Sequence, residues 1–351
     1  MTKVAIFTDS HSGVRGDAVA FADHQDWFYK EFFFPELEKR GIKTIFHGGD
    51  FFDRRQFITL KTMDRLKNTF IKCLTEGEYE LHLLVGNHDV LYRNTNTVNS
   101  PSILFHGYSS VHIYDEPTVV HDVLLVPWIN KENYDTSLEA LKNTKAKHVL
   151  GHFELKGFEM HRGQVCESGM TTEIFDRFQT VMSGHFHTRS SSGNITYLGS
   201  PFEMTWSDFN DPRGFHIFDT ETGELEFVKN PESMFFRCEY DTVENVKSWT
   251  PYKPVSLNSK YVKVIVKNKG NAYQFDEWLR EITSYSPADI QIVESTIDVI
   301  GVEFTLEEME NRSKSNIDIM NEYIQALGIS DEEKAGVFNY LKTIYAECIQ
   351  L

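Results

Sequence analysis

The sequence predicts an α/β layered domain, followed by a small α+β unit and a helical tail. Strand-like and helix-like segments alternate at the start of the chain, short β-rich segments separated by turn residues fill its middle, and apolar residues at helical spacing mark its end. The chain has 351 residues, of which 40% are apolar. This composition is sufficient for a packed core and for two to three folded units.

The first part of the chain alternates between the two element types. The predicted elements are a strand at 3–8, a helix at 23–40, a strand at 44–47, a helix at 58–74 and a strand at 81–85. Gly41 ends the first of these helices, because glycine is a common residue just after a helix. A βαβαβ order of this kind indicates a layered α/β domain.

The middle of the chain has a different texture. Short strands are predicted at 148–150, 180–182, 196–198, 215–218 and 225–228. Turn residues such as Ser192-Gly193-Asn194 separate them, and Asn230-Pro231 is a natural end for the domain. We therefore predict a first domain over residues 1–232.

Two smaller parts follow the first domain. Strands near 261–266 and 289–293 around a helix at 275–282 predict a small unit over residues 233–302. In the tail, Ile317, Met320, Ile324 and Leu327 are three or four residues apart, and Ser330 begins a second apolar stripe with a capping box. Residues 303–351 are therefore predicted to form a helical pair.

Composition and charge restrict the function. The net charge of −17 is unlike that of a protein that holds DNA tightly by itself, although bound cations would reverse the sign locally. The four cysteines lie far apart without a CxxC pair, which is typical of reduced thiols inside cells. Because there is neither a secretion signal nor a run of about 18 apolar residues, we expect an intracellular, cytoplasmic protein without a membrane partner.

Five polar motifs each follow a strand-like run. They are Asp9-x-His11, Gly49-Asp50-x-x-Asp53, Gly86-Asn87-His88-Asp89, Gly151-His152 and Gly184-His185-x-His187. In an open α/β sheet the ends of the strands converge on a crevice, so these side chains are expected to meet. Carboxylate, imidazole and amide ligands without thiolate suit ions such as manganese, iron or zinc, and not a structural zinc site.

The number of ligands indicates two metal ions. Two cations about 3.5–4 Å apart need a carboxylate between them, and Asp50, at the end of the second strand, is the natural bridge. Such a site activates a water and stabilises both oxygens of an in-line displacement at phosphorus.

This set of motifs resembles the calcineurin-like metallophosphoesterase superfamily, and within it the DNA-repair branch of SbcD-like and meiotic-recombination nucleases. Residues 210–215 and 218–222, the chain length and the short tail look most like the recombination-endonuclease subunits of T-even-like phages. The resemblance implies a metallophosphoesterase β-sandwich flanked by helices in residues 1–232. It also implies a capping, DNA-recognition domain in residues 233–302 and a helical pair in residues 303–351 that binds an ATPase.

The resemblance also implies roles for particular residues. One metal would be held by Asp9, His11 and His187, the other by Asn87, His152 and His185, with Asp50 between them. His88 would stabilise the transition state or protonate the leaving oxygen, and Asp53 would orient His88. Arg54 and Arg55 would meet substrate phosphate. Arg213, in a Pro-Arg-Gly turn, is interpreted as solvated, and His112 and His121 as structural.

The resemblance to this branch implies that the protein is a manganese-dependent 3′-to-5′ exonuclease on duplex DNA and an endonuclease on single strands. Members of this branch act with an SbcC-like, SMC-type ATPase in double-strand break processing, recombination and replication. The resemblance also implies a homodimer through the helix near 58–74, although the apolar stripe of that helix is equally compatible with a core role.

Two alternatives remain open from the sequence. A phosphomonoesterase would share the segment from Gly49 to Arg54, and a non-catalytic DNA-tethering scaffold would share the fold. The GNHD motif and the appended domain favour the nuclease over the phosphatase. The complete set of ligands disfavours the scaffold.

Overall fold

The computed structural model describes residues 3–161, 164–243, 246–252 and 254–294, together with positions 324, 334, 337 and 338. The chain divides into two compact units, Met1–Ile297 and Asp298–Leu351. The predicted helical pair at 303–351 lies almost wholly outside the described residues, so it stays a prediction. The elements below all belong to the first unit.

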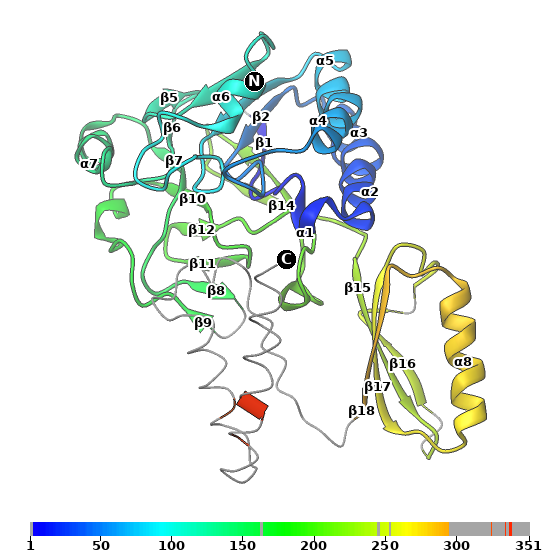
Figure 1. Cartoon of the computed structure of the whole chain (residues 1–351). Coiled ribbons are helices and arrows are strands. Elements are labelled where there is room, and N and C mark those ends of the chain that lie inside the picture. The colour runs from blue at the N-terminus through cyan, green and yellow to red at the C-terminus, as the bar shows by residue number, and fades with distance from the viewer. Residues whose placement is uncertain are drawn as a thin grey trace. The chain divides into compact units, whose positions relative to one another are not determined.

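Two six-stranded sheets pack face to face (Figure 1). The first has the order β14-β13-β1-β2-β3-β4, and the second has the order β11-β12-β10-β7-β6-β5. The strands of the first sheet are β1 (Lys3–Phe7), β2 (Thr44–His47), β3 (Glu80–Leu84), β4 (Val111–Tyr114), β13 (Gly214–Asp219) and β14 (Leu225–Lys229). Those of the second are β5 (Thr118–Val120), β6 (Val123–Val126), β7 (His148–His152), β10 (Thr180–Gly184), β11 (Ser190–Ser192) and β12 (Ile195–Tyr197).

The layer between the sheets is apolar. Ile6, Phe46 and Leu84 of the first sheet meet Leu125 and Leu150 of the second, and all five are fully buried. Because these strands are buried on both faces, they read as continuous apolar runs in the sequence. The predicted α/β sandwich flanked by helices is confirmed.

Helices cover the outer faces of both sheets. Those on the first sheet are α2 (Val19–Trp27), the π-helical η1 (Phe28–Phe33), α3 (Phe34–Arg40), α4 (Leu60–Leu66), the π-helical η2 (Lys67–Ile71) and α5 (Lys72–Glu76). The second sheet is covered by α7 (Tyr134–Asn143). Shorter elements are α1 (Val14–Asp17), α6 (Ser100–Leu104), β8 (Glu159–His161), β9 (Gln164–Val165), η3 (Glu173–Phe175) and η4 (Trp206–Asp208).

The apolar stripe of the helix predicted at 58–74 belongs to the core of its own chain. Leu66, Phe70, Ile71 and Leu74 are at most 5% exposed and pack on the first sheet. These four side chains cannot also form a dimer surface. The exposed large apolar side chains at the start of this helix are those of Phe57 and Leu60, which are 58% and 88% exposed.

A third sheet follows the sandwich. It has four strands in the order β16-β15-β17-β18, with α8 packed on one face (Figure 1). Its elements are β15 (Phe235–Asp241), β16 (Val246–Thr250), β17 (Tyr261–Asn268), α8 (Ala272–Ser284) and β18 (Asp289–Glu294). Val262, Val264 and Val266 alternate with more exposed residues along β17 and face Phe275 and Trp278 of α8. In the residues that the structure describes, no helix is long and apolar enough to cross a membrane.

Candidate metal centre

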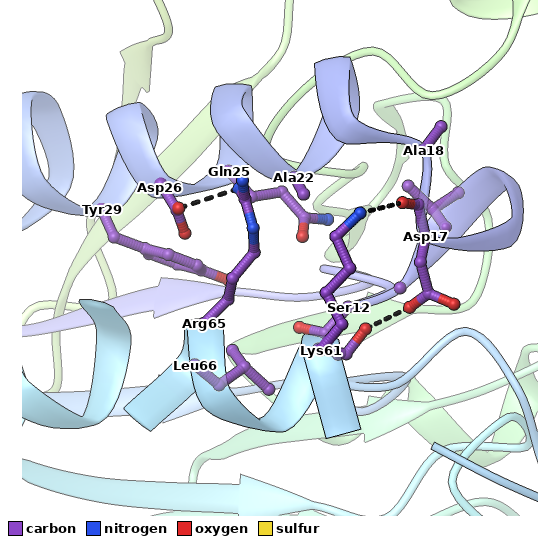
Figure 2. Close-up of a pocket in the computed structure, with 13 residues that line it drawn as sticks. Ser12, Asp17, Ala18, Ala22, Gln25, Asp26, Tyr29, Lys61, Arg65 and Leu66 are labelled. Carbon is purple, nitrogen blue, oxygen red and sulfur yellow. Dashed lines mark hydrogen bonds and ion pairs between the residues drawn. The ribbon is translucent and has the colours of Figure 1, made fainter. Parts of the chain in front are cut away.

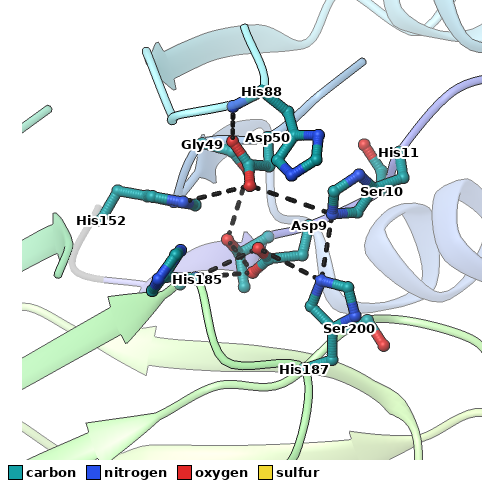
Figure 3. Close-up of polar contacts among 12 residues, drawn as sticks. Asp9, Ser10, His11, Gly49, Asp50, His88, His152, His185, His187 and Ser200 are labelled. Atoms are coloured by element: carbon teal, nitrogen blue, oxygen red, sulfur yellow. Dashed lines mark hydrogen bonds and ion pairs between the residues drawn. The ribbon is translucent and has the colours of Figure 1, made fainter. Parts of the chain in front are cut away.

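The five polar motifs meet at one edge of the sandwich (Figure 3). β1, β2 and β3 are parallel neighbours in the first sheet, and β7 and β10 are parallel neighbours in the second. Their carboxyl ends therefore lie at the same edge of each sheet, which is where side chains converge in α/β folds. The motifs follow or end these five strands.

Asp9, His11 and His187 form the first group of possible ligands, with ligand atoms within 4.8 Å of one another. Nε2 of His11 lies 3.1 Å from Nε2 of His187, and Nε2 of His187 lies 4.0 Å from Oδ1 of Asp9. Two imidazole nitrogens that face each other beside a buried carboxylate suit a shared cation.

Asp50, His152 and His185 form the second group. The amide oxygen of Asn87 joins it, at 2.9 Å from Nε2 of His152 and 2.8 Å from Nδ1 of His185. Oδ2 of Asp50 lies 3.2 Å from Nε2 of His152 and 3.9 Å from Nε2 of His11, which puts this carboxylate between the two groups. The donors are carboxylate, imidazole and amide groups, so the residues present fit two borderline divalent ions.

The backbone of the centre is held in unusual conformations. Asp9, His11, Asp50 and His185 have φ angles of 52°, 42°, 55° and 85°. Non-glycine residues rarely adopt left-handed backbone, and each such residue costs on the order of 1–3 kcal/mol. Four of them in one cluster indicate that the surrounding contacts enforce the geometry. The carboxylate of Asp9, for example, accepts hydrogen bonds from the main-chain N–H of His185 at 3.1 Å.

Glycine is required where the strand-end loops touch. A Cβ atom on Gly86 would lie 2.2 Å from Oδ1 of Asp50, and one on Gly184 would lie 2.1 Å from Oγ1 of Thr8. The absence of a side chain at these positions lets the ligand loops of different strands approach each other.

The charges of the centre favour an ionised Asp50. Burial would raise the pKa of this carboxyl, but His152 and His88 hold it well below its usual range. In turn, although burial lowers the pKa of His152, the Asp50 carboxylate raises it to about 9. A carboxylate that stays charged while fully buried suits a group that offsets neighbouring cations.

His88 lies over the centre, and two contacts fix its position. Its main-chain N–H donates to Oδ1 of Asp50 at 2.7 Å, and its Nδ1 lies 2.8 Å from the main-chain carbonyl oxygen of Asp53. The Asp53 carboxylate instead lies 3.5 Å from Nδ1 of His11. The loop therefore turns the Asp53 carbonyl toward His88 and the carboxylate toward His11, and the orienting role of Asp53 toward His88 stays a prediction.

The two arginines after the second motif make contacts within the protein. Nη1 of Arg54 lies 3.3 Å from Oδ2 of Asp17, and its guanidinium lies over the ring of Phe57. Nε of Arg55 donates to the main-chain carbonyl of Asn87 at 2.7 Å. Arg55 thereby supports the loop that carries Asn87, and a phosphate at Arg54 would compete with Asp17.

Asp89, the acid of the GNHD motif, has a supporting role that the sequence analysis missed. Its fully buried carboxylate accepts hydrogen bonds from the main-chain N–H groups of Phe51, Phe52 and Gly86, at 2.9–3.1 Å. It therefore ties the loop after β2 to the loop after β3, which carry Asp50 and Asn87. The aspartate at the end of the GNHD motif is the sequence feature from which this supporting role could have been predicted.

Arg213 was interpreted as solvated, and this interpretation was wrong. Its side chain is 3% exposed and lies 2.9 Å from Oδ1 of the buried Asp208. It also donates to the main-chain carbonyl of His187 and to Oγ of Ser200. Arg213 therefore holds the loop that presents His187, which no local pattern reveals.

Two further side chains border the second group. Oε2 of Glu154 lies 3.7 Å from Nε2 of His185, and the ring of Trp128 lies 5.3 Å from that of His185. The side chain of Glu154 is 38% exposed, so it faces the solvent side of the centre.

A small pocket lies between α2 and α4, apart from these ligands (Figure 2). Its cavity volume is about 20 Å³, which is room for about one water molecule. Arg65 and Asp26 form an ion pair of 3.0 Å beside it, and Nζ of Lys61 lies 3.4 Å from the main-chain oxygen of Asp17. None of the proposed metal ligands lines this pocket, and it is too small for a nucleotide.

An α/β sandwich whose strand ends gather two groups of carboxylate and imidazole donors defines a metal-dependent phosphoesterase. The family model of the calcineurin-like phosphoesterases matches residues 2–189, more than half of the chain. This chain belongs to that family. The predicted family and enzyme class are thus confirmed.

Among curated proteins, the chain is similar to "Exonuclease subunit 1" of Enterobacteria phage T4. The two are 34% identical over 318 residues, which cover 89% of this chain and 90% of that protein. This relative lies in the phage group that the sequence analysis named.

Solved structures show weaker likeness. A novel archaeal phosphodiesterase is 12% identical, with coverage of 65% of this chain and 99% of that chain and a TM-score of 0.32. A dimetal phosphatase from Danio rerio is also 12% identical, with coverage of 62% and 92% and a TM-score of 0.35. At these scores the alignments add nothing to the assignment of the site.

Proposed function

We propose that this protein is a two-metal nuclease that hydrolyses DNA phosphodiester bonds. The observation that carries the proposal is the position of Asp50 between two ligand groups, with His88 fixed above them. The similarity to a phage exonuclease subunit over nine tenths of both chains supports DNA as the substrate.

The proposed ligand sets follow the two groups. Asp9, His11 and His187 would hold one ion, and Asn87, His152 and His185 the other, with Asp50 shared. Bound divalent ions, which we propose to be manganese, supply an activated water and charge stabilisation at the phosphate. The resident cofactor would therefore be two Mn²⁺ ions.

The protein itself supplies proton transfer and orientation. Nδ1 of His88 faces the Asp53 carbonyl and would donate its proton to that oxygen. In the imidazolium form Nε2 carries a second proton, which it would give to the leaving oxygen. The main-chain hydrogen bond from His88 to Asp50 keeps that imidazole beside the bridging carboxylate. We propose that His88 stabilises or protonates the leaving sugar oxygen.

A metal-dependence assay tests this function. The purified chain should cut single-stranded and duplex DNA with Mn²⁺ and not with a chelator, and Asp50→Asn should lose both metal and activity. Glu221→Gln, at an exposed turn between β13 and β14, is the control. Full occupancy of both sites in Asp50→Asn contradicts the bridge, and cleavage of phosphomonoesters without cleavage of DNA supports the phosphatase alternative.

We further propose that the protein acts with an SbcC-like, SMC-type ATPase in double-strand break processing, recombination and replication. The acidic net charge of −17 leaves DNA binding to a partner, and residues 303–351 would provide the contact. Removing the residues after Val302 should abolish co-purification with the ATPase and ATP-stimulated cutting of duplex DNA, while short single strands are still cut. Retained co-purification contradicts the tail as the binding segment.

We also propose that the protein forms a homodimer near the helix at 58–74. Because the apolar stripe of this helix is buried, the contact would use the exposed side chains at its start. Phe57 and Leu60 are the exposed apolar side chains at the start of this helix. Leu60→Glu should yield a monomer in analytical ultracentrifugation, whereas an unchanged mass would place the dimer contact elsewhere.

A further inference from the structure

A second cluster of metal-binding side chain types lies at the opposite end of β3 from the catalytic motif. It consists of Glu80, His82, His112 and His121. Glu80 is the first residue of β3, whereas Asn87 follows the last. His82 and Asn87 are five positions apart in the sequence, which corresponds to at most roughly 16 Å at about 3.3 Å per residue.

The strand register brings this cluster together. His82 and His112 are paired residues on the parallel strands β3 and β4, and Glu80 shares a face with His82 two positions earlier. His121 approaches from the second sheet, in the turn between β5 and β6, where its φ of 48° lies in the left-handed region. The cluster therefore joins an edge strand of one sheet to the edge hairpin of the other.

Three ligand atoms of the cluster are close enough to share an ion. Those of Glu80, His82 and His121 all lie within 4.8 Å of one another. Nε2 of His112 lies 2.9 Å from Oε1 of Glu80, and Nε2 of His82 lies 3.7 Å from the same atom. Three atoms at such separations can all lie within about 2.8 Å of a common point, while zinc needs about 2.0–2.2 Å. Small rotations of the exposed Glu80 and His121 side chains close this difference.

The ring of His82 is already oriented for metal binding. Its side chain is 5% exposed, Nδ1 lies 2.8 Å from the hydroxyl of Tyr114, and Nε2 is buried without a hydrogen-bond partner. When Nδ1–H donates to Tyr114, the lone pair of Nε2 points toward Glu80, and such an outer partner usually fixes a metal-binding histidine.

We propose that Glu80, His82 and His121 form a zinc site separate from the catalytic centre, with His112 beside Glu80. Two imidazoles and one carboxylate, with water in the fourth position, suit tetrahedral Zn²⁺, and the exposure of Glu80 and His121 gives the ion access from solvent. The bound ion clamps the edges of the two sheets together and so stabilises the folded sandwich.

Zinc titration of the full chain tests the site. After removal of metals, bound zinc is counted by equilibrium dialysis and elemental analysis, and melting temperature is followed against zinc concentration. His121→Gly, which tolerates the left-handed backbone, should bind one zinc ion fewer than the wild type and lose part of the thermal shift. Tyr114→Phe should weaken this site by roughly 10- to 100-fold.

Two comparisons separate this site from the catalytic centre. His106→Ala, at another exposed histidine, should bind as much zinc as the wild type. In a His185→Ala background, His121→Gly should still remove one ion, and His121→Gly alone should keep the Mn²⁺-dependent activity. Equal zinc stoichiometry and affinity in the wild type and His121→Gly would overturn the proposal.

Discussion

The main-chain carbonyl of Asp53 lies 2.8 Å from Nδ1 of His88, while the carboxylate of the same residue lies 3.5 Å from Nδ1 of His11. One loop residue therefore contacts two histidines through two different groups. Because the carbonyl survives any side-chain substitution, the two roles are experimentally separable.

Replacing Asp53 by alanine tests this division. The variant loses the carboxylate beside His11 but keeps the carbonyl beside His88, so its Mn²⁺ affinity should fall by roughly 10- to 100-fold. Its rate at saturating Mn²⁺ should stay near that of the wild type. Mn²⁺ titration of DNA cleavage measures both quantities. A lower saturating rate with unchanged Mn²⁺ affinity would show that the Asp53 carboxylate acts on His88 and not on His11.

Replacing His88 by asparagine should have the reverse effect. Loss of a positioned proton donor lowers the rate by about 10²–10⁴-fold, whereas metal content should remain because His88 is not a proposed ligand. Elemental analysis together with a single-turnover cleavage assay measures the two effects. If the variant lacks an ion, His88 is itself a ligand.

The buried pair of Asp208 and Arg213 should contribute strongly to stability. Burial alone would raise the pKa of Asp208, but the Arg213 guanidinium holds it below its usual value. Asp208→Asn leaves a buried guanidinium without this partner, which should lower the free energy of unfolding by about 3 kcal/mol in urea denaturation. Asp211→Asn is the control: Asp211 also lies 2.9 Å from Arg213 but is 24% exposed, so its loss should cost less than about 1 kcal/mol. Equal losses in both variants would contradict the role of burial.

The free energy of unfolding should decrease as the pH rises toward the pKa of the Glu203 carboxyl group. This side chain accepts hydrogen bonds from the main-chain N–H groups of Met234 and Phe235, and burial raises its pKa to about 7. The folded state therefore holds a proton that the unfolded state has released, so this group favours folding least above pH 7.

Denaturation at several pH values measures this effect. Between about pH 4.5 and pH 7 the wild type should lose on the order of 1–3 kcal/mol that Glu203→Gln does not lose. Glu221→Gln, at an exposed position, should follow the wild type. A Glu203→Gln variant with the same pH profile as the wild type would exclude the contribution of Glu203.

Much of the fold and the motif residues of the centre could be predicted from the sequence. The apolar runs and turn residues that predict a strand at 81–85 and a helix at 58–74 are local, and the structure has these elements at Glu80–Leu84 and Leu60–Glu76. The ligand motifs are also local, since each directly follows a strand. Parallel strands bring their carboxyl ends together whatever the details of the packing.

Only the tertiary structure decided which groups face each other. The direction of the Asp53 carboxylate, the burial of Arg213 and the meeting of His82 with His121 each depend on segments far apart in the chain. Helical and strand periodicity gives the face on which a side chain lies but not its partner across an interface, because the partner is set by the packing of two sheets and by left-handed turns such as that at His121. Distances between non-adjacent segments are therefore fixed by packing, which no local pattern encodes.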